Sequence, residues 1–108
     1  MNIIFGRENA EKLREKYTVL DLEKLVVEDK EVEVFCLIPA EKIALPDLPQ
    51  LENWVKLHHD FLHGYNTQQW NYSRQCIEYL MGKFGGELDT FYEEILKRIN
   101  SAEAQKTD

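Results

Sequence analysis

The sequence predicts an α+β fold: a small three-stranded sheet with one crossover helix, followed by a three-helix C-terminal half. Short apolar runs, one of them clearly alternating, fill the N-terminal part, as is typical of strands. Apolar residues three and four apart dominate the C-terminal part, as in helices with one buried face. All three prolines stand between the two patterns: Pro39 closes the first, and Pro46 and Pro49 disfavour helix at the residues before them.

Three segments are expected to be strands: Asn2–Phe5, Val19–Val27 and Glu31–Ile38. The last of them alternates, and the short polar stretch before it predicts a hairpin with the second. A helix over Arg7–Tyr17 is expected between the first two strands. A right-handed crossover through it would make the first strand parallel to the second. The order of the strands in the sheet stays open.

Capping residues suggest where the first two C-terminal helices begin. Asp47, with Gln50 three residues later, resembles a capping box that starts a helix ending near Tyr65. Thr67 is expected to cap the next helix, which should break at Gly85-Gly86.

The last helix is expected over Glu87–Ile99, with acidic residues in its first turn and basic residues in its last, as the helix dipole favours. We expect residues 1–100 to form a single globular domain. The polar tail, Ser101–Asp108, is expected to be disordered.

Composition excludes several classes of function. The formal net charge of −7 argues against direct binding of nucleic acid, which depends on Lys and Arg. No apolar run approaches the roughly 20 residues needed to span a bilayer, and no signal peptide is evident, so a cytoplasmic protein without a membrane partner is expected. Cys36 and Cys76 lie in apolar runs and are expected to be buried thiols in a reducing compartment.

All three histidines lie in one short stretch, KLHHDFLHGYNTQQW. His58 falls within the apolar stripe of its helix and is expected to pack at the core edge, with a ring nitrogen bonded to a backbone carbonyl. His59 and His63 lie one turn apart with Asp60 beside them, a spacing that can bind a metal ion and could support a small metal-assisted hydrolase. A solvated helix face is the favoured reading, because no general-base glutamate or third ligand accompanies the pair.

No catalytic residue and no cofactor-binding residue can be assigned, because no nucleophile, phosphate-binding loop or acid/base pair is complete. The favoured function is therefore a non-enzymatic interaction module: an adaptor, regulator or assembly component with a protein partner, or one that associates with itself. The expected contact residues are exposed aromatic and aliphatic side chains, namely Tyr72, Tyr79, Ile43, Leu45 and Leu48. Self-association is expected through the last two helices.

A second alternative is an acidic decoy that occupies the nucleic-acid-binding surface of a host protein. The predicted hairpin carries Glu28, Asp29, Glu31 and Glu33, which could form a negative ribbon. Solubilising charge is the favoured explanation for these carboxylates.

Two resemblances add to these expectations. The segment Trp54–Phe84, with Tyr65, Trp70, Ser73, Ile77 and Leu80 in sequence, resembles a degenerate single tetratricopeptide-type helical hairpin, although its closing proline is absent. This resemblance implies a helix pair that binds other proteins.

The runs MNIIFGRENAEKLREKYTVLDLE and LMGKFGGELDTFYEEILKRI are similar to those of small uncharacterised proteins of large tailed phages of marine cyanobacteria. This second resemblance implies a viral protein in a host cytoplasm and assigns no functional residue.

Overall fold

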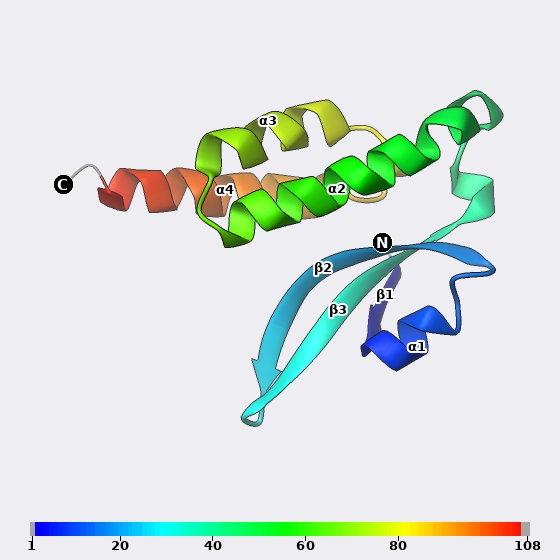
Figure 1. Ribbon diagram of the computed structural model, residues 1–108, viewed down its shortest axis with the longest axis horizontal. Coiled ribbons are helices and arrows are strands. Elements are labelled where there is room, and N and C mark those ends of the chain that lie inside the picture. Colours follow the sequence, from blue (N-terminus) through cyan, green and yellow to red (C-terminus); the bar gives the residue numbers. More distant parts are fainter. Residues whose placement is uncertain (1, 107–108) are drawn as a thin grey trace. The chain divides into compact units, whose positions relative to one another are not determined.

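A computed structural model of the chain describes residues 2–106, with side chains described as far as residue 104 (Figure 1). The α+β class is confirmed: a three-stranded antiparallel sheet precedes a helical C-terminal half. The chain divides into two compact units, Met1–Leu48 and Pro49–Asp108, where the sequence led us to expect one domain over residues 1–100. Among the described residues, no helix is both long and apolar enough to cross a membrane.

The first unit contains the sheet. Its strands are β1 (Asn2–Phe5), β2 (Tyr17–Val27) and β3 (Lys30–Pro39), in the order β1-β3-β2. Both β1 and β2 pair antiparallel with β3. They therefore run in the same direction, as the expected crossover requires, but β3 lies between them.

Helix α1 (Arg7–Glu11) covers one face of this sheet and is shorter than the expected Arg7–Tyr17. Tyr17 already belongs to β2, where it pairs with Pro39, so strand pairing overrides the helical spacing of the sequence. Between helix and strand the chain turns through bonds to residues three back, such as Leu13 N–H to Ala10 O at 3.0 Å.

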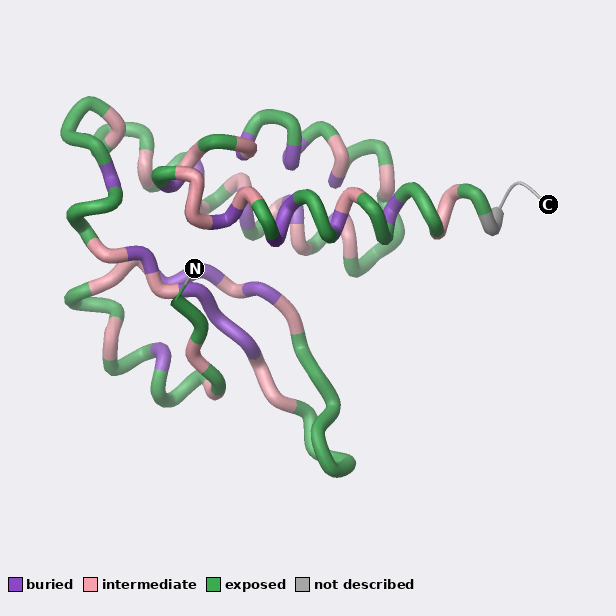
Figure 2. The backbone as a smooth tube through the Cα atoms, turned by 180° about the vertical axis from the view of Figure 1, so that it is seen from behind, coloured by how far each residue is buried: buried purple, intermediate pink, exposed green. Residues whose placement is uncertain are grey.

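Under α1 lies a small apolar cluster of Ala10, Val19 and Phe35, with Ile4 and Leu37 packed against it. The opposite face of the sheet is also apolar in its central part, where Leu20 pairs with Cys36 and both are buried. Figure 2 shows this burial in the central parts of β2 and β3, and exposure at the end of their hairpin. Apolar residues on both faces explain why the strands read as nearly continuous apolar runs.

The second unit is built from α2 (Leu51–Asn66), α3 (Trp70–Leu80) and α4 (Asp89–Lys106). Helix α3 packs against both α2 and α4. The short 3₁₀ turns η1 (Ala40–Lys42) and η2 (Leu45–Gln50) precede α2, and η3 (Phe84–Gly86) precedes α4. The largest fully buried side chains of this unit are Tyr92, Phe61, Phe84, Ile77, Leu80, Leu88, Ile95, Ile99 and His58.

Both expected caps are wrong. Asp47 lies inside η2 with its N–H bonded to Ala44 O, and α2 begins after Gln50 without a side-chain cap. Thr67 follows α2 and donates its hydroxyl to His63 O at 2.7 Å, so it closes α2 instead of opening α3. The chain then reverses at Gln68, which has a positive φ of 63°.

Helix α4 runs to Lys106, beyond the expected end at Ile99 and into the segment expected to be disordered. Arg74 of α3 explains this extension, because it donates to Glu103 at 2.6 Å and to Asn100 at 3.2 Å. Residues 107 and 108 of the expected tail lie outside the described residues.

Candidate interaction surface

The histidine stretch lies on α2, and its three rings have different surroundings. His58 is fully buried, whereas His59 and His63 are exposed and Asp60 is half-buried. Within the described part of the chain, no group of three or more His, Cys, Asp or Glu side chains could hold a metal ion. The structure therefore supplies no third ligand to the pair His59 and His63, and a metal centre here stays a prediction.

His58 interacts with a side chain that the sequence did not suggest. Its Nδ1 lies 2.9 Å from the hydroxyl oxygen of Tyr92 on α4. The rings of Phe61, Phe84 and Phe91 lie around it with centroids 5.6 to 6.5 Å away. This buried and fully enclosed histidine is a packing residue rather than a group open to a substrate.

Neither cysteine is placed as a nucleophile. Cys36 and Cys76 are both buried, and neither forms a disulfide in the described structure. Burial raises the pKa of the Cys76 thiol, because it disfavours the charged thiolate that attacks substrates and binds metals.

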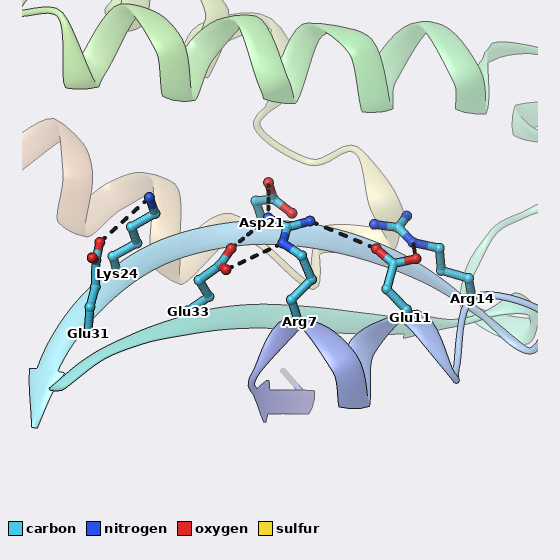
Figure 3. Close-up of polar contacts among 7 residues, drawn as sticks. All are labelled: Arg7, Glu11, Arg14, Asp21, Lys24, Glu31 and Glu33. Carbon is cyan, nitrogen blue, oxygen red and sulfur yellow. Dashed lines mark hydrogen bonds and ion pairs between the residues drawn. The ribbon is translucent and has the colours of Figure 1, made fainter.

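The carboxylates of the expected negative ribbon are partly neutralised by neighbouring cations (Figure 3). Arg7 of α1 donates to Glu33 through Nε at 3.3 Å and through an Nη atom at 2.6 Å. Lys24 lies 3.6 Å from Glu31 across the hairpin. The pKa of Glu33 is lowered, first by its hydrogen bond from Arg7. Two of the four carboxylates are thus held in ion pairs.

The expected contact residues differ in exposure. Tyr72 and Tyr79 are 43% and 55% exposed on α3, and Leu45 and Leu48 are also exposed. Ile43 is buried, so its place in an exposed patch is wrong. The ring of Tyr72 lies against Gly64 of α2, and Lys83 Nζ lies 5.3 Å from the ring centroid of Tyr79. Both tyrosines are thus already engaged within the second unit.

A further exposed apolar group lies at the free end of the β2–β3 hairpin. Strand β1 ends at Phe5, opposite Val34, and Gly6 N–H still bonds to Glu33 O, so residues 30–32 of β3 extend past this edge and pair with β2 alone. We call residues 24–33 the β arm. Leu25, Val26 and Val27 of this arm are 39%, 76% and 51% exposed. Three consecutive large apolar side chains are thus left open to solvent on a strand at the edge of the sheet.

The two faces of the β arm differ in character. Val26 shares one face with the charged residues Lys24, Glu31 and Glu33, whereas Leu25 and Val27 share the other with Val32 and Lys30. The arm ends in a two-residue turn, Glu28-Asp29, with positive φ values of 51° and 66°. Such a turn matches the twist of the strands, although it usually contains Asn and Gly. Main-chain groups, apolar side chains and charged side chains are therefore all accessible on the β arm.

The sequence singled out the β arm for its carboxylates alone; its exposed apolar side chains and the His58–Tyr92 pair were not expected as functional features. The run Leu25-Val26-Val27 itself was a usable signal, because three successive apolar residues beside a turn cannot all face one buried side of a strand.

The described residues thus form an α+β chain of two compact units with a two-stranded arm at the end of its sheet. No protein-family model matches the chain, and neither does any curated protein or solved structure.

Proposed function

We propose that this protein is a non-enzymatic protein-interaction module that contacts its partner through the β arm. The observation that carries this proposal is the exposure of Leu25, Val26 and Val27 on an edge strand. Natural proteins usually protect such edges with charges, proline or a covering element, because an unpaired strand edge is a template for another strand. An edge that keeps three apolar side chains in water suits a surface that is covered in a complex.

The energetic gain from covering this edge would be substantial. Burial of one Val or Leu side chain contributes about 1.5–3 kcal/mol when it is complete. Added main-chain hydrogen bonds would contribute to affinity as in other complexes formed by strand addition. The resemblance to proteins of cyanobacterial phages makes a cyanobacterial extract the source in which a foreign partner is sought.

The test compares capture of partners from a cyanobacterial extract by the wild type and by the variant Leu25→Thr/Val26→Thr/Val27→Thr. Threonine preserves strand propensity, replaces one methyl of each valine by a hydroxyl and substitutes a shorter, polar side chain for Leu25, so the arm should remain folded. We expect a protein that the wild type captures, and that cross-links to residues 24–33, to be lost from the variant.

The matched control is Tyr72→Ser/Tyr79→Ser, which alters the exposed face of α3 and leaves the β arm intact. It should retain the partner. Loss of the partner from this control but not from the threonine variant would transfer the site to α3. Turnover of a small molecule by the purified protein would overturn the non-enzymatic class.

A further inference from the structure

We propose that the β arm recognises a second copy of this chain, by antiparallel pairing of the two β2 edges about a twofold axis at Val26. This inference rests on the proposed function, because it uses the same arm and names its partner. The paired arms would join two three-stranded sheets into one continuous six-stranded sheet.

The main chain of β2 is oriented for this pairing. A two-residue turn places the residues on either side of it, Val27 and Lys30, in a hydrogen-bonded pair. By alternation, Leu25 also bonds towards β3, whereas Val26 and Lys24 direct their N–H and C=O groups away from the sheet. The bond from Gly6 N–H to Glu33 O, at 2.9 Å, agrees with this pattern, since it shows that the Glu33 carbonyl points away from β2.

With the axis at Val26, Lys24 of each copy lies across from Glu28 of the other, the residue that directly follows β2 and begins the turn. Opposite charges on facing strands attract, and the symmetry supplies this pair twice. Leu25 stands opposite Val27 on one face, and the two Val26 side chains face each other between the charge pairs on the other face. Every strand position from Lys24 to Val27 thus meets a complementary group.

Neighbouring registers are less favourable. A shift by one residue would set outward-directed main-chain groups against inward-directed ones, which leaves them without partners. A shift by two residues towards the start of β2 would place Lys24 opposite Val26 and lose both charge pairs. In the proposed register the next facing residues would be Glu23 and Asp29, which carry like charges. They do not meet, because Asp29 is the second residue of the turn and no longer follows the line of β2.

A second copy is a better occupant than an unrelated strand because of this self-complementarity. A foreign strand would need an acidic residue and two or three apolar residues in matching order. The sequence Lys24-Leu25-Val26-Val27-Glu28 is complementary to its own reverse. When a second copy runs antiparallel to the first, its glutamate lies across from the lysine and its Val27 lies across from Leu25.

The first test is a charge exchange, measured by sedimentation equilibrium and light scattering from about 1 μM to about 1 mM, the range in which small interfaces associate. The wild type should form dimers within this range. Lys24→Glu and Glu28→Lys should each raise the dimer dissociation constant by about tenfold or more, because each makes two like-charge pairs. The double variant Lys24→Glu/Glu28→Lys should restore dimerisation, although it does not restore the ion pair between Lys24 and Glu31 within the chain.

The second test is disulfide cross-linking, which reports the register directly. Facing residues of antiparallel strands have Cα atoms about 4.5–5.5 Å apart, within the range that a disulfide spans. Val26→Cys should therefore cross-link to itself, and Leu25→Cys should cross-link to Val27→Cys when the two variants are mixed, because these positions all lie within β2. Lys24→Cys alone should not, because its two copies would be about 13 Å apart along the strands. The wild type controls for the buried Cys36 and Cys76.

A wild type that stays monomeric up to about 1 mM overturns the inference, and so does a dimer that is unaffected by either single charge reversal. Cross-linking of Lys24→Cys to itself would equally exclude the proposed register. The proposed function can still hold in these cases, since capture of a foreign protein that depends on Leu25, Val26 and Val27 would then identify a different occupant of the β arm. If the protein neither dimerises nor captures a foreign protein through these three residues, both the inference and the proposed function are rejected.

Discussion

The Nδ1 atom of His58 lies 2.9 Å from the hydroxyl oxygen of Tyr92 in the buried centre of the second unit. The two residues come from α2 and α4 and are both fully buried. A polar contact in such surroundings fixes the relative position of the helices, because an unpaired polar group there is costly.

Replacing Tyr92 by Phe should lower the free energy of unfolding of the second unit by about 1–3 kcal/mol, the cost of leaving a buried polar partner unsatisfied. Trp54 and Trp70 are the two tryptophans of the chain and both lie in this unit, so their fluorescence during urea unfolding measures the change. Tyr79→Phe, on the exposed side of α3, should change the free energy by less than about 0.5 kcal/mol. Equal effects of the two substitutions would contradict a structural role for the His58–Tyr92 pair.

Ile95 tests the packing of α4. It is 1% exposed, so Ile95→Ala should destabilise the second unit by about 2–5 kcal/mol through lost burial and the cavity left behind. The same tryptophan signal provides the measurement. The exposed neighbour Lys97 is the control, and Lys97→Ala should be almost neutral. An unchanged urea midpoint for Ile95→Ala would show that this face of α4 does not pack as described.

Gly64 and Tyr72 should be energetically coupled. A Cβ atom added at Gly64 would lie 2.9 Å from Cδ2 of Tyr72, too close for the ring to stay in place. Alanine is otherwise favoured over glycine within a helix by about 1 kcal/mol. We therefore expect Gly64→Ala to stabilise the second unit in a Tyr72→Ala background but not in the wild type. A double-mutant cycle measures this difference, and identical effects in both backgrounds would show that the two residues do not interact.

The ion pairs of Arg7 predict a dependence on pH. The pKa of Glu33 lies below its ordinary value of 4.5 because of the hydrogen bond from Arg7, and the pKa of Glu11 is lowered chiefly by its hydrogen bond from Arg14. A carboxyl with a depressed pKa in the folded state stabilises the fold above its unfolded pKa. That stabilisation is lost as the pH falls through the folded value.

Arg7→Gln should therefore destabilise the first unit at pH 7, and the difference from the wild type should disappear towards pH 3. This unit contains no tryptophan, so the measurement is urea unfolding followed by the amide NMR signals of Val34 and Leu37 in β3. Lys12→Gln removes one positive charge from the same region and serves as the control. Arg7 also lies over the ring of Phe35. If the loss of unfolding free energy in Arg7→Gln were the same at pH 7 and pH 3, Arg7 would act through this packing and not through its ion pairs.

The strands were largely predictable because their signal is local. Asn2–Phe5 was expected with the bounds that the structure has, and β2 and β3 extend the expected segments by one or two residues at their ends. The caps were not predictable in the same way. Thr67 can bond either to the helix before it or to the helix after it. The choice depends on the positive φ of Gln68, which could not be predicted because glutamine seldom adopts a positive φ.

The candidate surface depended on tertiary structure. Leu25, Val26 and Val27 have the sequence of a buried strand, but they lie at the hairpin end of β2, outside the cluster that α1 covers around Val19 and Phe35. His58 was correctly placed at the core, but its partner Tyr92 lies 34 residues away in the sequence, beyond the reach of helical spacing. Arg7 and Glu33 are similarly joined across 26 residues.

Strand β3 is central in the sheet, yet it comes last of the three in the sequence. During synthesis on the ribosome, β1 and β2 therefore emerge before the strand with which both must pair. The hairpin of β2 and β3 can then close across two residues, whereas β1 must find β3 across a much longer loop, which carries a larger entropic cost. We expect the nascent chain to hold its apolar β2 segment unpaired until β3 appears, and β1 to dock last.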